Sequence, residues 1–272
     1  MSHQLLEGKT GIIFGALDEN SIAWKVATRA HEEGAKFILT NAPVALRMGK
    51  INELAEQTGS QVIGADATSL DDIHALLDAA SEQYGKLDFV LHSIGMSPNV
   101  RKNREYTNLN YSWLEKTYDI SAVSFHKIMQ TLFQRELMND WGSILALTYI
   151  AAQRTFGKYN DMAEAKALLE SIARSFGYHF GHKNNVRVNT ISQSPTPTTA
   201  GTGVGGFDKM LYYSEQMSPL GNATAEECAN YCIMMFSDFT RRVTMQNLFH
   251  DGGFSSVGVN EAIFDSMNFP EE

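Results

Sequence analysis

Short apolar runs alternate with amphipathic stretches along almost the whole chain, and this alternation constrains the fold more than any other feature. Strands separated by helices form βαβ units, which build a parallel sheet covered by helices on both faces. The sequence therefore predicts an α/β fold with one doubly wound domain over residues 1–272. We expect seven strands in its parallel sheet, at Thr10–Phe14, Lys36–Thr40, Gln61–Gly64, Phe89–Ser93, Ser143–Thr148, Val186–Ile191 and Asn247–His250.

Composition excludes several classes of function. A chain of 272 residues, 43% of them hydrophobic, can bury one large core, and its net charge of −9 argues against a nucleic-acid partner. No apolar run approaches the length of about 18 residues that a membrane span needs, and Met1–Gln4 does not begin a secretion signal. Cys228 and Cys232 are too few for a structural zinc site, so we expect a cytoplasmic protein without a metal.

The first expected strand leads into a turn that suits a dinucleotide. Gly15 permits a tight turn close to a ligand, and Ser21 and Ile22 begin the next helix. Backbone N–H groups at a helix start, together with the helix dipole, favour a pyrophosphate. The usual three-glycine fingerprint of a Rossmann-like domain is missing, so an ordinary strand–helix turn is the alternative.

Other strand ends are consistent with a dinucleotide site. The carboxylate of Asp66 could accept an adenine amino hydrogen, although an exposed helix cap is the alternative, and Gly95 lets a ribose or nicotinamide approach the backbone. The second strand ends at Asn41, with no nearby carboxylate or arginine to distinguish the two nicotinamide cofactors. The candidate cofactor-binding residues are Gly15, Ser21, Ile22, Asn41, Asp66, Ala67, Ser93, Ile94 and Gly95.

Two phenols and one ammonium, those of Tyr149, Tyr159 and Lys166, lie within 18 residues just after the fifth expected strand. Tyr159 and Lys166 are seven apart on an expected helix, which is two turns, so both point the same way. A lysine near a tyrosine favours the phenolate and makes the phenol a better acid. The commoner reductase pattern places lysine four residues after tyrosine, where this chain has Ala163.

A glycine- and proline-rich segment, Gln193–Gly206, follows the sixth expected strand. Ligands bind at the carboxyl ends of the strands in a doubly wound sheet, so this segment is a candidate lid over residues 193–215. A disordered connection is the alternative interpretation.

With these residues in place, the chain resembles the bacterial enoyl-acyl-carrier-protein reductases of the short-chain dehydrogenase superfamily. The resemblance covers about Leu6 to Val259. The Tyr-x6-Lys spacing combined with a second tyrosine is specific to that family, whereas the motifs of the last two strands occur across the superfamily. The motifs are Ser21-Ile22-Ala23, His92-Ser93-Ile94-Gly95, Tyr149-x9-Tyr159-x6-Lys166, Asn185–Ser192 and His250–Phe254.

The resemblance implies hydride transfer from NADH, with NADPH also possible, to a 2-enoyl thioester carried on acyl carrier protein. It implies that Tyr159 binds the thioester oxygen, that Lys166 holds the nicotinamide ribose and that Tyr149 lines the acyl pocket. It also implies a homotetramer. The resemblance adds Pro195, Thr196 and Thr198 as cofactor contacts, and Gly95, Met96, Ala200, Phe207 and Met210 as substrate contacts.

Two departures from the family pattern accompany the resemblance. Gln193-Ser194-Pro195 stands where Ala-Gly-Pro is common, and serine removes the backbone freedom of glycine beside the nicotinamide. The lid is less basic than is common, and Arg101–Arg104 is the alternative source of a positive field for an acidic carrier protein. A solvated loop without a partner is the simpler interpretation of that tract.

Two other functions stay open at this stage. A carbonyl reductase on the same fold usually has a serine on the preceding strand and lysine four residues after tyrosine, whereas this chain has Tyr149 and Ala163 at those places. A non-catalytic nicotinamide-binding regulator does not need Tyr159 and Lys166 together.

Overall fold

A seven-stranded parallel sheet organises the protein, whose computed structural model describes residues 3–199, 201–202 and 206–267. The strand order is β3-β2-β1-β4-β5-β6-β7, and every pairing between neighbouring strands is parallel. The order reverses between β1 and β4, which places a crevice at the carboxyl ends of these strands. The strands are β1 (Thr10–Phe14), β2 (Lys36–Asn41), β3 (Gln61–Gly64), β4 (Leu87–His92), β5 (Met138–Thr148), β6 (Arg187–Gln193) and β7 (Asn247–His250).

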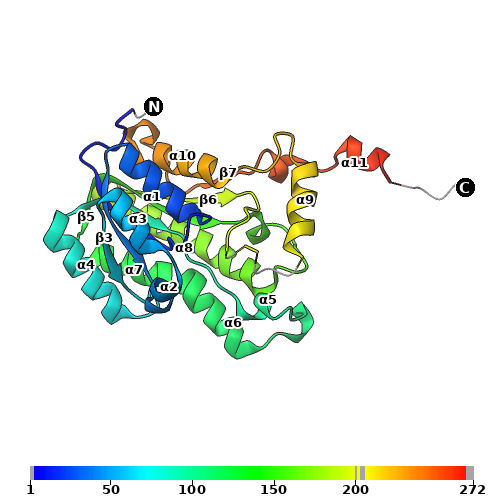
Figure 1. The fold of residues 1–272 in the computed structure, drawn as a ribbon, viewed down its shortest axis with the longest axis horizontal. Coiled ribbons are helices and arrows are strands. Elements are labelled where there is room, and N and C mark those ends of the chain that lie inside the picture. The colour runs from blue at the N-terminus through cyan, green and yellow to red at the C-terminus, as the bar shows by residue number, and fades with distance from the viewer. Residues whose placement is uncertain (1–2, 200, 203–205, 268–272) are drawn as a thin grey trace, which may run out of the picture.

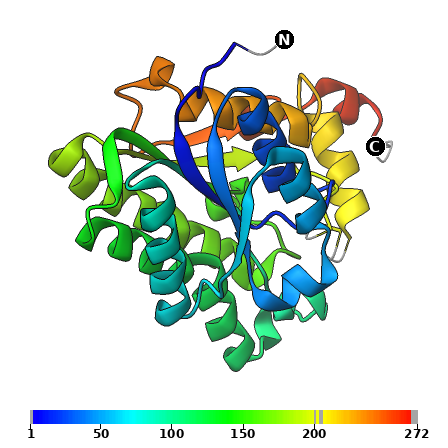
Figure 2. The same ribbon diagram turned by 60° about the vertical axis from the view of Figure 1, so that its left-hand side comes forward.

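Helices cover both faces of the sheet, which confirms the predicted doubly wound α/β fold (Figures 1 and 2). One face carries α1 (Ile22–Glu32), α3 (Ile51–Thr58) and α10 (Ala225–Phe236). The other face carries α4 (Leu70–Tyr84), α7 (Ser124–Gln134) and α8 (Asn160–Asn184). The remaining α-helices of the described residues are α2 (Pro43–Met48), α5 (Pro98–Arg101), α6 (Tyr111–Tyr118), α9 (Phe207–Met217) and α11 (Glu261–Asp265).

Two apolar cores lie on the two faces of the sheet, and neighbouring residues of one strand supply both. Ile12 and Ile13 of β1 are both fully buried, but Ile12 packs in the core under α4, α7 and α8, whereas Ile13 packs in the core under α1 and α10. Successive side chains of a strand point to opposite faces, so a strand covered on both sides must be apolar throughout. This requirement produces the continuous apolar runs from which the strands were predicted.

The structure differs from the sequence-based expectation at several element ends. β5 begins at Met138, five residues earlier than expected, because its first residues include polar ones that lack an apolar pattern. α6 and α7 are joined without a break by a π-helical turn at Asp119–Val123. Tyr159 precedes the first residue of α8 as its N-cap, so it lies at the helix start rather than within the helix. No helix in the described part of the chain is long and apolar enough to cross a membrane.

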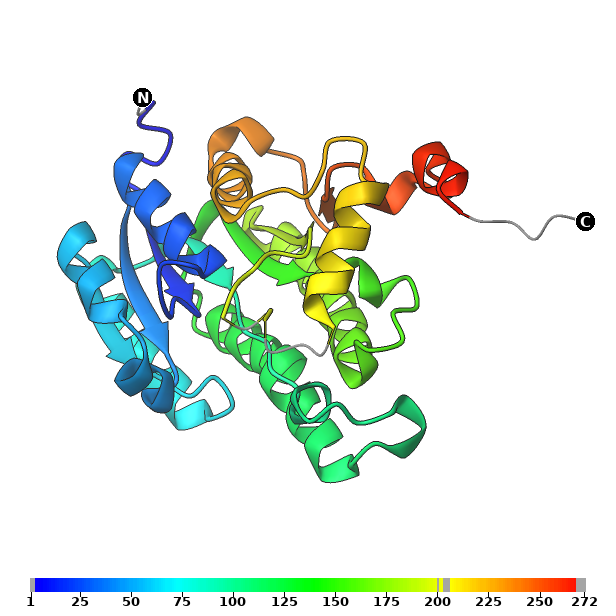
Figure 3. The same cartoon turned by 45° about the vertical axis from the view of Figure 1, so that its right-hand side comes forward.

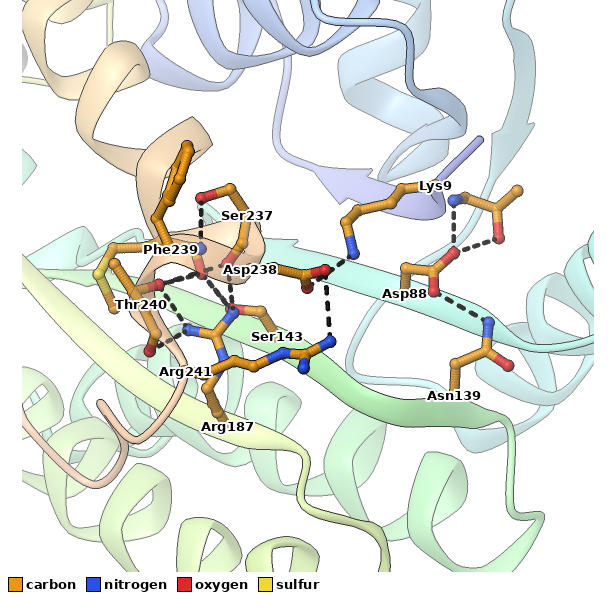
Figure 4. Close-up of polar contacts among 12 residues, drawn as sticks. Lys9, Asp88, Asn139, Ser143, Arg187, Ser237, Asp238, Phe239, Thr240 and Arg241 are labelled. Carbon is orange, nitrogen blue, oxygen red and sulfur yellow. Dashed lines mark hydrogen bonds and ion pairs between the residues drawn. The ribbon is translucent and has the colours of Figure 1, made fainter. Parts of the chain in front are cut away.

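Polar contacts close the amino-terminal edge of the sheet, as Figure 4 shows. Arg187, the first residue of β6, is buried and donates to Thr240 O at 3.2 Å, Thr240 Oγ1 at 2.8 Å, Met235 O at 2.8 Å and Ser237 O at 3.1 Å. Asp88 accepts from the Thr10 backbone N–H at 2.8 Å and from Asn139 Nδ2 at 3.0 Å. These contacts fasten the end of α10 and the starts of the strands together.

Candidate active site

A cavity of about 210 Å³ opens at the carboxyl edge of the sheet. The ends of β4, β5 and β6 form its floor, the first two turns of α8 form one wall, and the segment after β6 leads to α9 across it. In Figures 1 and 3, α9 lies between the sheet and the C-terminal segment that carries α11. The lining residues are Ile22, Ser93, Ile94, Gly95, Met96, Ser97, Val100, Arg101, Leu147, Thr148, Tyr149, Tyr159, Met162, Lys166, Gln193, Ser194, Pro195, Thr196, Thr198, Gly201, Phe207 and Met210.

The three residues singled out by their spacing meet in this cavity. Tyr149 follows the last residue of β5, Tyr159 caps α8, and Lys166 lies two turns into that helix. The rings of Tyr149 and Tyr159 are 5.1 Å apart between centroids and inclined at 56°. Strand end and helix start thus bring two phenols and an ammonium to one surface, as the sequence predicts.

Lys166 is a buried cation that uses only part of its hydrogen-bond donors within the described residues. Its side chain is 8% exposed, and its Nζ donates to Leu147 O at 2.7 Å. Within the described residues this is its one hydrogen bond, so two N–H bonds of the ammonium remain for a ligand. Burial lowers the pKa of Lys166 to about 8, against an opposing effect of Glu170.

The phenols are neutral donors in this structure. Burial raises the pKa of Tyr159, and burial together with Tyr159 and Asp251 raises the pKa of Tyr149. The expected attraction between Lys166 and a Tyr159 phenolate does not contribute to this shift, because burial is its one cause and burial favours the neutral phenol. Tyr149 lines the cavity, and its hydroxyl is buried and has no hydrogen-bond partner among the described residues.

A buried carboxylate, which the sequence analysis missed, lies one turn beyond Lys166. Glu170 accepts from Thr148 Oγ1 at 2.9 Å, Gln153 Nε2 at 3.1 Å and Asn247 Nδ2 at 3.2 Å. Burial raises the pKa of Glu170 above its ordinary value. The carboxylate therefore connects the end of β5 and the start of β7 to α8. Its position four residues after Lys166, which is one helical turn, is the feature of the sequence that could have revealed it.

The turn between β1 and α1 has the geometry expected of a dinucleotide site. Gly15 has a φ of 95°, and a Cβ there would lie 2.0 Å from the Ser93 carbonyl oxygen, so only glycine fits this close approach of two strand ends. The Ser21 hydroxyl donates to Asp18 O at 2.7 Å and accepts from Leu17 N, which shapes the entry to α1. Ile22, the first residue of α1, lines the cavity, so the positive end of this helix faces it.

Several predicted cofactor residues do not line the cavity. Gly15 and Ser21 are not among its lining residues. The Asn41 side chain bonds to backbone, donating to Ala16 O at 3.0 Å and accepting from Ala42 N at 2.9 Å. Asp66 is exposed and accepts from the Thr68 backbone N–H and hydroxyl. Ala67 is buried beside it. Their adenosine-binding roles stay predictions, and Ala200 lies outside the described residues.

The segment after β6 is held by the side chains that depart from the family pattern. Ser194 has no positive φ, so its position does not need glycine. Its N–H donates to His250 O at 3.1 Å, and its hydroxyl accepts from Ala223 N at 3.0 Å. Gln193 Nε2 donates to Ala223 O at 2.8 Å, and Gln193 Oε1 accepts from His250 Nδ1 at 2.6 Å. The two substituted side chains therefore fix the wall of the cavity beside Thr196.

A second hollow of about 960 Å³ lies on the other side of Tyr159. It runs between residues 154–158, α9 and residues 254–258, and it shares Tyr159 and Met210 with the first cavity. The Tyr159 side chain thus stands in the wall between the two hollows.

A doubly wound sheet that carries a tyrosine and a lysine at the start of the helix after β5, facing a cavity at the carboxyl edge, defines a reductase domain of the short-chain dehydrogenase class. Within that class the chain belongs to the enoyl-acyl-carrier-protein reductase family, because the family model described as "Enoyl-(Acyl carrier protein) reductase" matches residues 15–255.

Similar proteins carry the same description. The chain is 35% identical over 257 residues, 94% of this chain and 93% of the other, to "Enoyl-[acyl-carrier-protein] reductase [NADH] 1" of Rhizobium meliloti. It resembles the crystal structure of a FabI–NADH complex from Alistipes finegoldii with a TM-score of 0.96 and 60% identity, covering 98% of this chain and 94% of that one. A Bacillus cereus enoyl-acyl carrier protein reductase with NADP+ and an indole naphthyridinone gives a TM-score of 0.88 at 31% identity, covering 95% and 100%.

Proposed function

We propose that the protein is an NADH-dependent enoyl-[acyl-carrier-protein] reductase, which reduces the 2,3 double bond of a trans-2-enoyl thioester during fatty acid elongation. The observation that carries this proposal is the cavity into which the neutral phenol of Tyr159 and the ammonium of Lys166 both project. Membership of the enoyl reductase family and the resemblance to a FabI–NADH complex support it.

The residues at the crevice fit a nicotinamide dinucleotide. The two spare N–H bonds of Lys166 would hold the nicotinamide ribose hydroxyls, and the free N–H groups at the start of α1 would hold the pyrophosphate. Gly95 lets the cofactor approach the backbone, and Thr196 and Thr198 line the cavity beside it. When bound, NADH supplies the hydride. No carboxylate lies among residues 42–49 after β2 to exclude a 2′-phosphate, and Arg47 is the nearest arginine, so NADPH stays a second candidate.

Tyr159 is the residue we propose to stabilise the charge that develops on the substrate. Arrival of a hydride at the β-carbon moves negative charge onto the thioester oxygen, and a donor aimed at that oxygen lowers the barrier. The raised pKa of Tyr159 keeps its hydrogen in place at neutral pH. Tyr149, with its unused hydroxyl, would line the acyl pocket beside it.

We propose that residues 193–215 act as a lid within the single domain. Phe207 and Met210 of α9 line the cavity, and Phe207 is buried. Thr199 Oγ1 donates to Asp18 Oδ2 at 2.6 Å, which joins this segment to the turn between β1 and α1. A closed lid would exclude water from the hydride transfer.

The basic tract after β4 is our candidate for docking the carrier protein. Arg101 lines the cavity, and Arg101 and Lys102 are exposed. Charge reversal at Arg101, Lys102 and Arg104 should raise KM for a carrier-linked substrate at low salt and leave KM for a coenzyme-A-linked substrate unchanged. An equal effect on both substrates would remove the docking role.

We further propose a homotetramer that works in the cytoplasm. Leu168 and Tyr178 leave apolar surface exposed along α8, which would suit a subunit interface. Cys228 and Cys232 are free, buried thiols, which suit a reducing compartment. Light scattering on the purified protein should give four times the chain mass, and a monomer mass would contradict the tetramer.

The decisive experiment follows oxidation of the reduced nicotinamide at neutral pH with a short trans-2-enoyl thioester, with a ketone, and without substrate. We expect rapid oxidation of NADH with the enoyl thioester, slower oxidation of NADPH, and none with the ketone. Turnover of the ketone alone would assign a carbonyl reductase, and cofactor binding without turnover of either would assign a binding protein.

A further inference from the structure

A fully buried carboxylate, that of Asp161, lies two residues after Tyr159 and outside the machinery described so far. We propose that Asp161 is a positioning residue: it fastens the wall of the substrate cavity to α8, the helix that Tyr159 precedes. This inference rests on the proposed function. It concerns the distance between the wall and the reacting groups, not a contact with the substrate.

Three donors from two segments converge on the Asp161 carboxylate. Ser97 Oγ donates to Oδ1 at 2.6 Å, Asn99 Nδ2 donates to Oδ2 at 2.8 Å, and Thr117 Oγ1 donates to Oδ2 at 2.9 Å. Asn99, Thr117 and Asp161 are fully buried, and Ser97 is 3% exposed. Such a set of hydrogen bonds shielded from water is directional and specifies one arrangement of the segments it joins.

Each donor belongs to the wall of the cavity or to its support. Ser97 lines the cavity and caps α5, where its hydroxyl accepts from Val100 N at 3.0 Å. Asn99 Oδ1 accepts from Asn110 N at 3.0 Å, so the same side chain holds the connection to α6. Thr117 is on α6, and its single hydroxyl hydrogen lies between Asp161 Oδ2 at 2.9 Å and Trp113 O at 2.8 Å. The wall from Gly95 to Arg101 is thus attached to α8 through Asp161.

The position of Asp161 in the first turn of α8 explains how a carboxylate is tolerated there. The free N–H groups of the helix start place a partial positive charge beside it, and charge-assisted hydrogen bonds replace the water that burial removes. A neutral amide of the same size would supply one acceptor oxygen and would turn two N–H donors toward Asn99 and Thr117, both of which donate now.

The same turn of helix carries the contact between wall and catalytic groups. Met162 Cε would lie 3.3 Å, and Lys166 Nζ 3.5 Å, from a Cβ placed on Gly95, so the wall and α8 are already in close approach there. Release of Ser97 and Asn99 from Asp161 would let the wall move away from Tyr159 and Lys166. Small misplacement of the substrate relative to catalytic groups can cost about 100-fold in rate.

The test uses Asp161→Asn in the full-length protein, with Glu33→Gln as the matched control. Glu33 is also a fully buried carboxylate, but it accepts from His3 N, Leu5 N and Arg29 at the end of α1 remote from the cavity. We expect Asp161→Asn to lower kcat/KM for the enoyl thioester by about tenfold to 100-fold, and to affect the Kd of NADH less. Glu33→Gln should lower stability without changing kcat/KM.

A second pair of variants keeps the proposal testable if Asp161→Asn does not fold. Thr117 does not line the cavity, so Thr117→Val removes one donor to Asp161, whereas Thr117→Ser keeps the hydroxyl. We expect Thr117→Val to lose about fivefold in kcat/KM, the factor that one hydrogen bond corresponds to. Thr117→Ser should keep the wild-type value. Equal kinetics in the two variants would contradict the proposal.

Hydrogen exchange of residues 97–110 separates this proposal from the proposed function. The Val100 and Asn110 amides, held by Ser97 and Asn99, should exchange faster in Asp161→Asn and not in Glu33→Gln. Unchanged exchange, or a kcat/KM loss that Glu33→Gln shares, would overturn the positioning role. If the wild type fails to reduce the enoyl thioester, the proposed function falls, and the exchange result still decides whether Asp161 holds the wall.

Discussion

Lys166 and Arg187 are the two lysine or arginine side chains that are buried within the described residues, and they lie at opposite edges of the same sheet. Arg187 makes four hydrogen bonds to Thr240, Met235 and Ser237 at the amino edge (Figure 4). Lys166 makes one, to Leu147 O, at the carboxyl edge. Burial lowers the pKa of both.

The difference between these two cations separates structural from functional burial. The guanidinium of Arg187 offers most of its donors to fixed carbonyl oxygens, so its desolvation is compensated inside the fold. The ammonium of Lys166 keeps two donors directed at a cavity, so its desolvation is compensated only in part until a ligand arrives. An under-used buried cation is therefore a marker of a binding site.

Tyr159→Phe gives the largest effect we expect at the carboxyl edge. Loss of one donor to a developing oxyanion typically lowers kcat by about 100-fold to 1000-fold. The free energy of unfolding should not fall, because the hydroxyl has no hydrogen bond to the rest of the described structure. Steady-state assays that follow NADH oxidation measure kcat. Retention of wild-type kcat would exclude Tyr159 from the reaction.

Arg187→Met should have its effect on stability and not on catalysis. It removes the four hydrogen bonds that the guanidinium donates to Thr240, Met235 and Ser237, which should cost about 3 kcal/mol of unfolding free energy. Chemical denaturation measures this loss, and kcat of the folded variant should equal that of the wild type. A large fall in kcat without a fall in stability would remove the contrast between the two edges.

Lys166→Met should show the reverse pattern. The substitution removes a buried charge that makes one hydrogen bond, so the unfolding free energy should stay constant or rise. The Kd for NADH, measured by fluorescence titration, should increase about tenfold to 100-fold, as expected for loss of charged hydrogen bonds. Destabilisation like that of Arg187→Met would show that Lys166 is mainly structural.

The smallest effect we expect is the dependence of NADH affinity and of stability on pH, which should come from Lys166 and not from Arg187. The pKa of Lys166 is lowered from 10.5 to about 8, so NADH affinity should decline above pH 8 as the ammonium loses its proton, by no more than the loss expected for Lys166→Met. Stability should change with the opposite sign, because between pH 8 and 10.5 the unfolded chain binds more protons than the folded one. Lys166→Arg should abolish both trends, and their persistence there would assign them to another group.

The sequence predicted the sheet well because burial on both faces imposes a strong pattern. All seven strands, and the meeting of Tyr149, Tyr159 and Lys166, follow from apolar runs and helical spacing. The lowered pKa of Lys166 and the raised pKa of Tyr159 did not follow, because desolvation depends on the whole surroundings and not on two neighbouring charges.

Long-range polar contacts were equally hidden from the sequence. Asp161 receives hydrogen bonds from residues 44 to 64 positions away, so no local pattern reveals them. Ser194 shows the opposite case. Its replacement of glycine looked disruptive, yet the backbone there has no positive φ and the hydroxyl finds a partner in Ala223 N. Only the folded positions of residues 223 and 250 show why serine is suitable.

The hydrogen bond from Thr199 to Asp18 also has a consequence for how a bound cofactor would be released. It is exposed, so breaking it should cost about 1 kcal/mol, which leaves this contact open in roughly one molecule in six at any moment. In the lid that we propose, a contact this weak would exclude water while closed and would open often enough for spent cofactor to leave. Under that proposal, cofactor release would be limited by how tightly Lys166 and the start of α1 hold the cofactor, not by the opening of the Thr199–Asp18 contact.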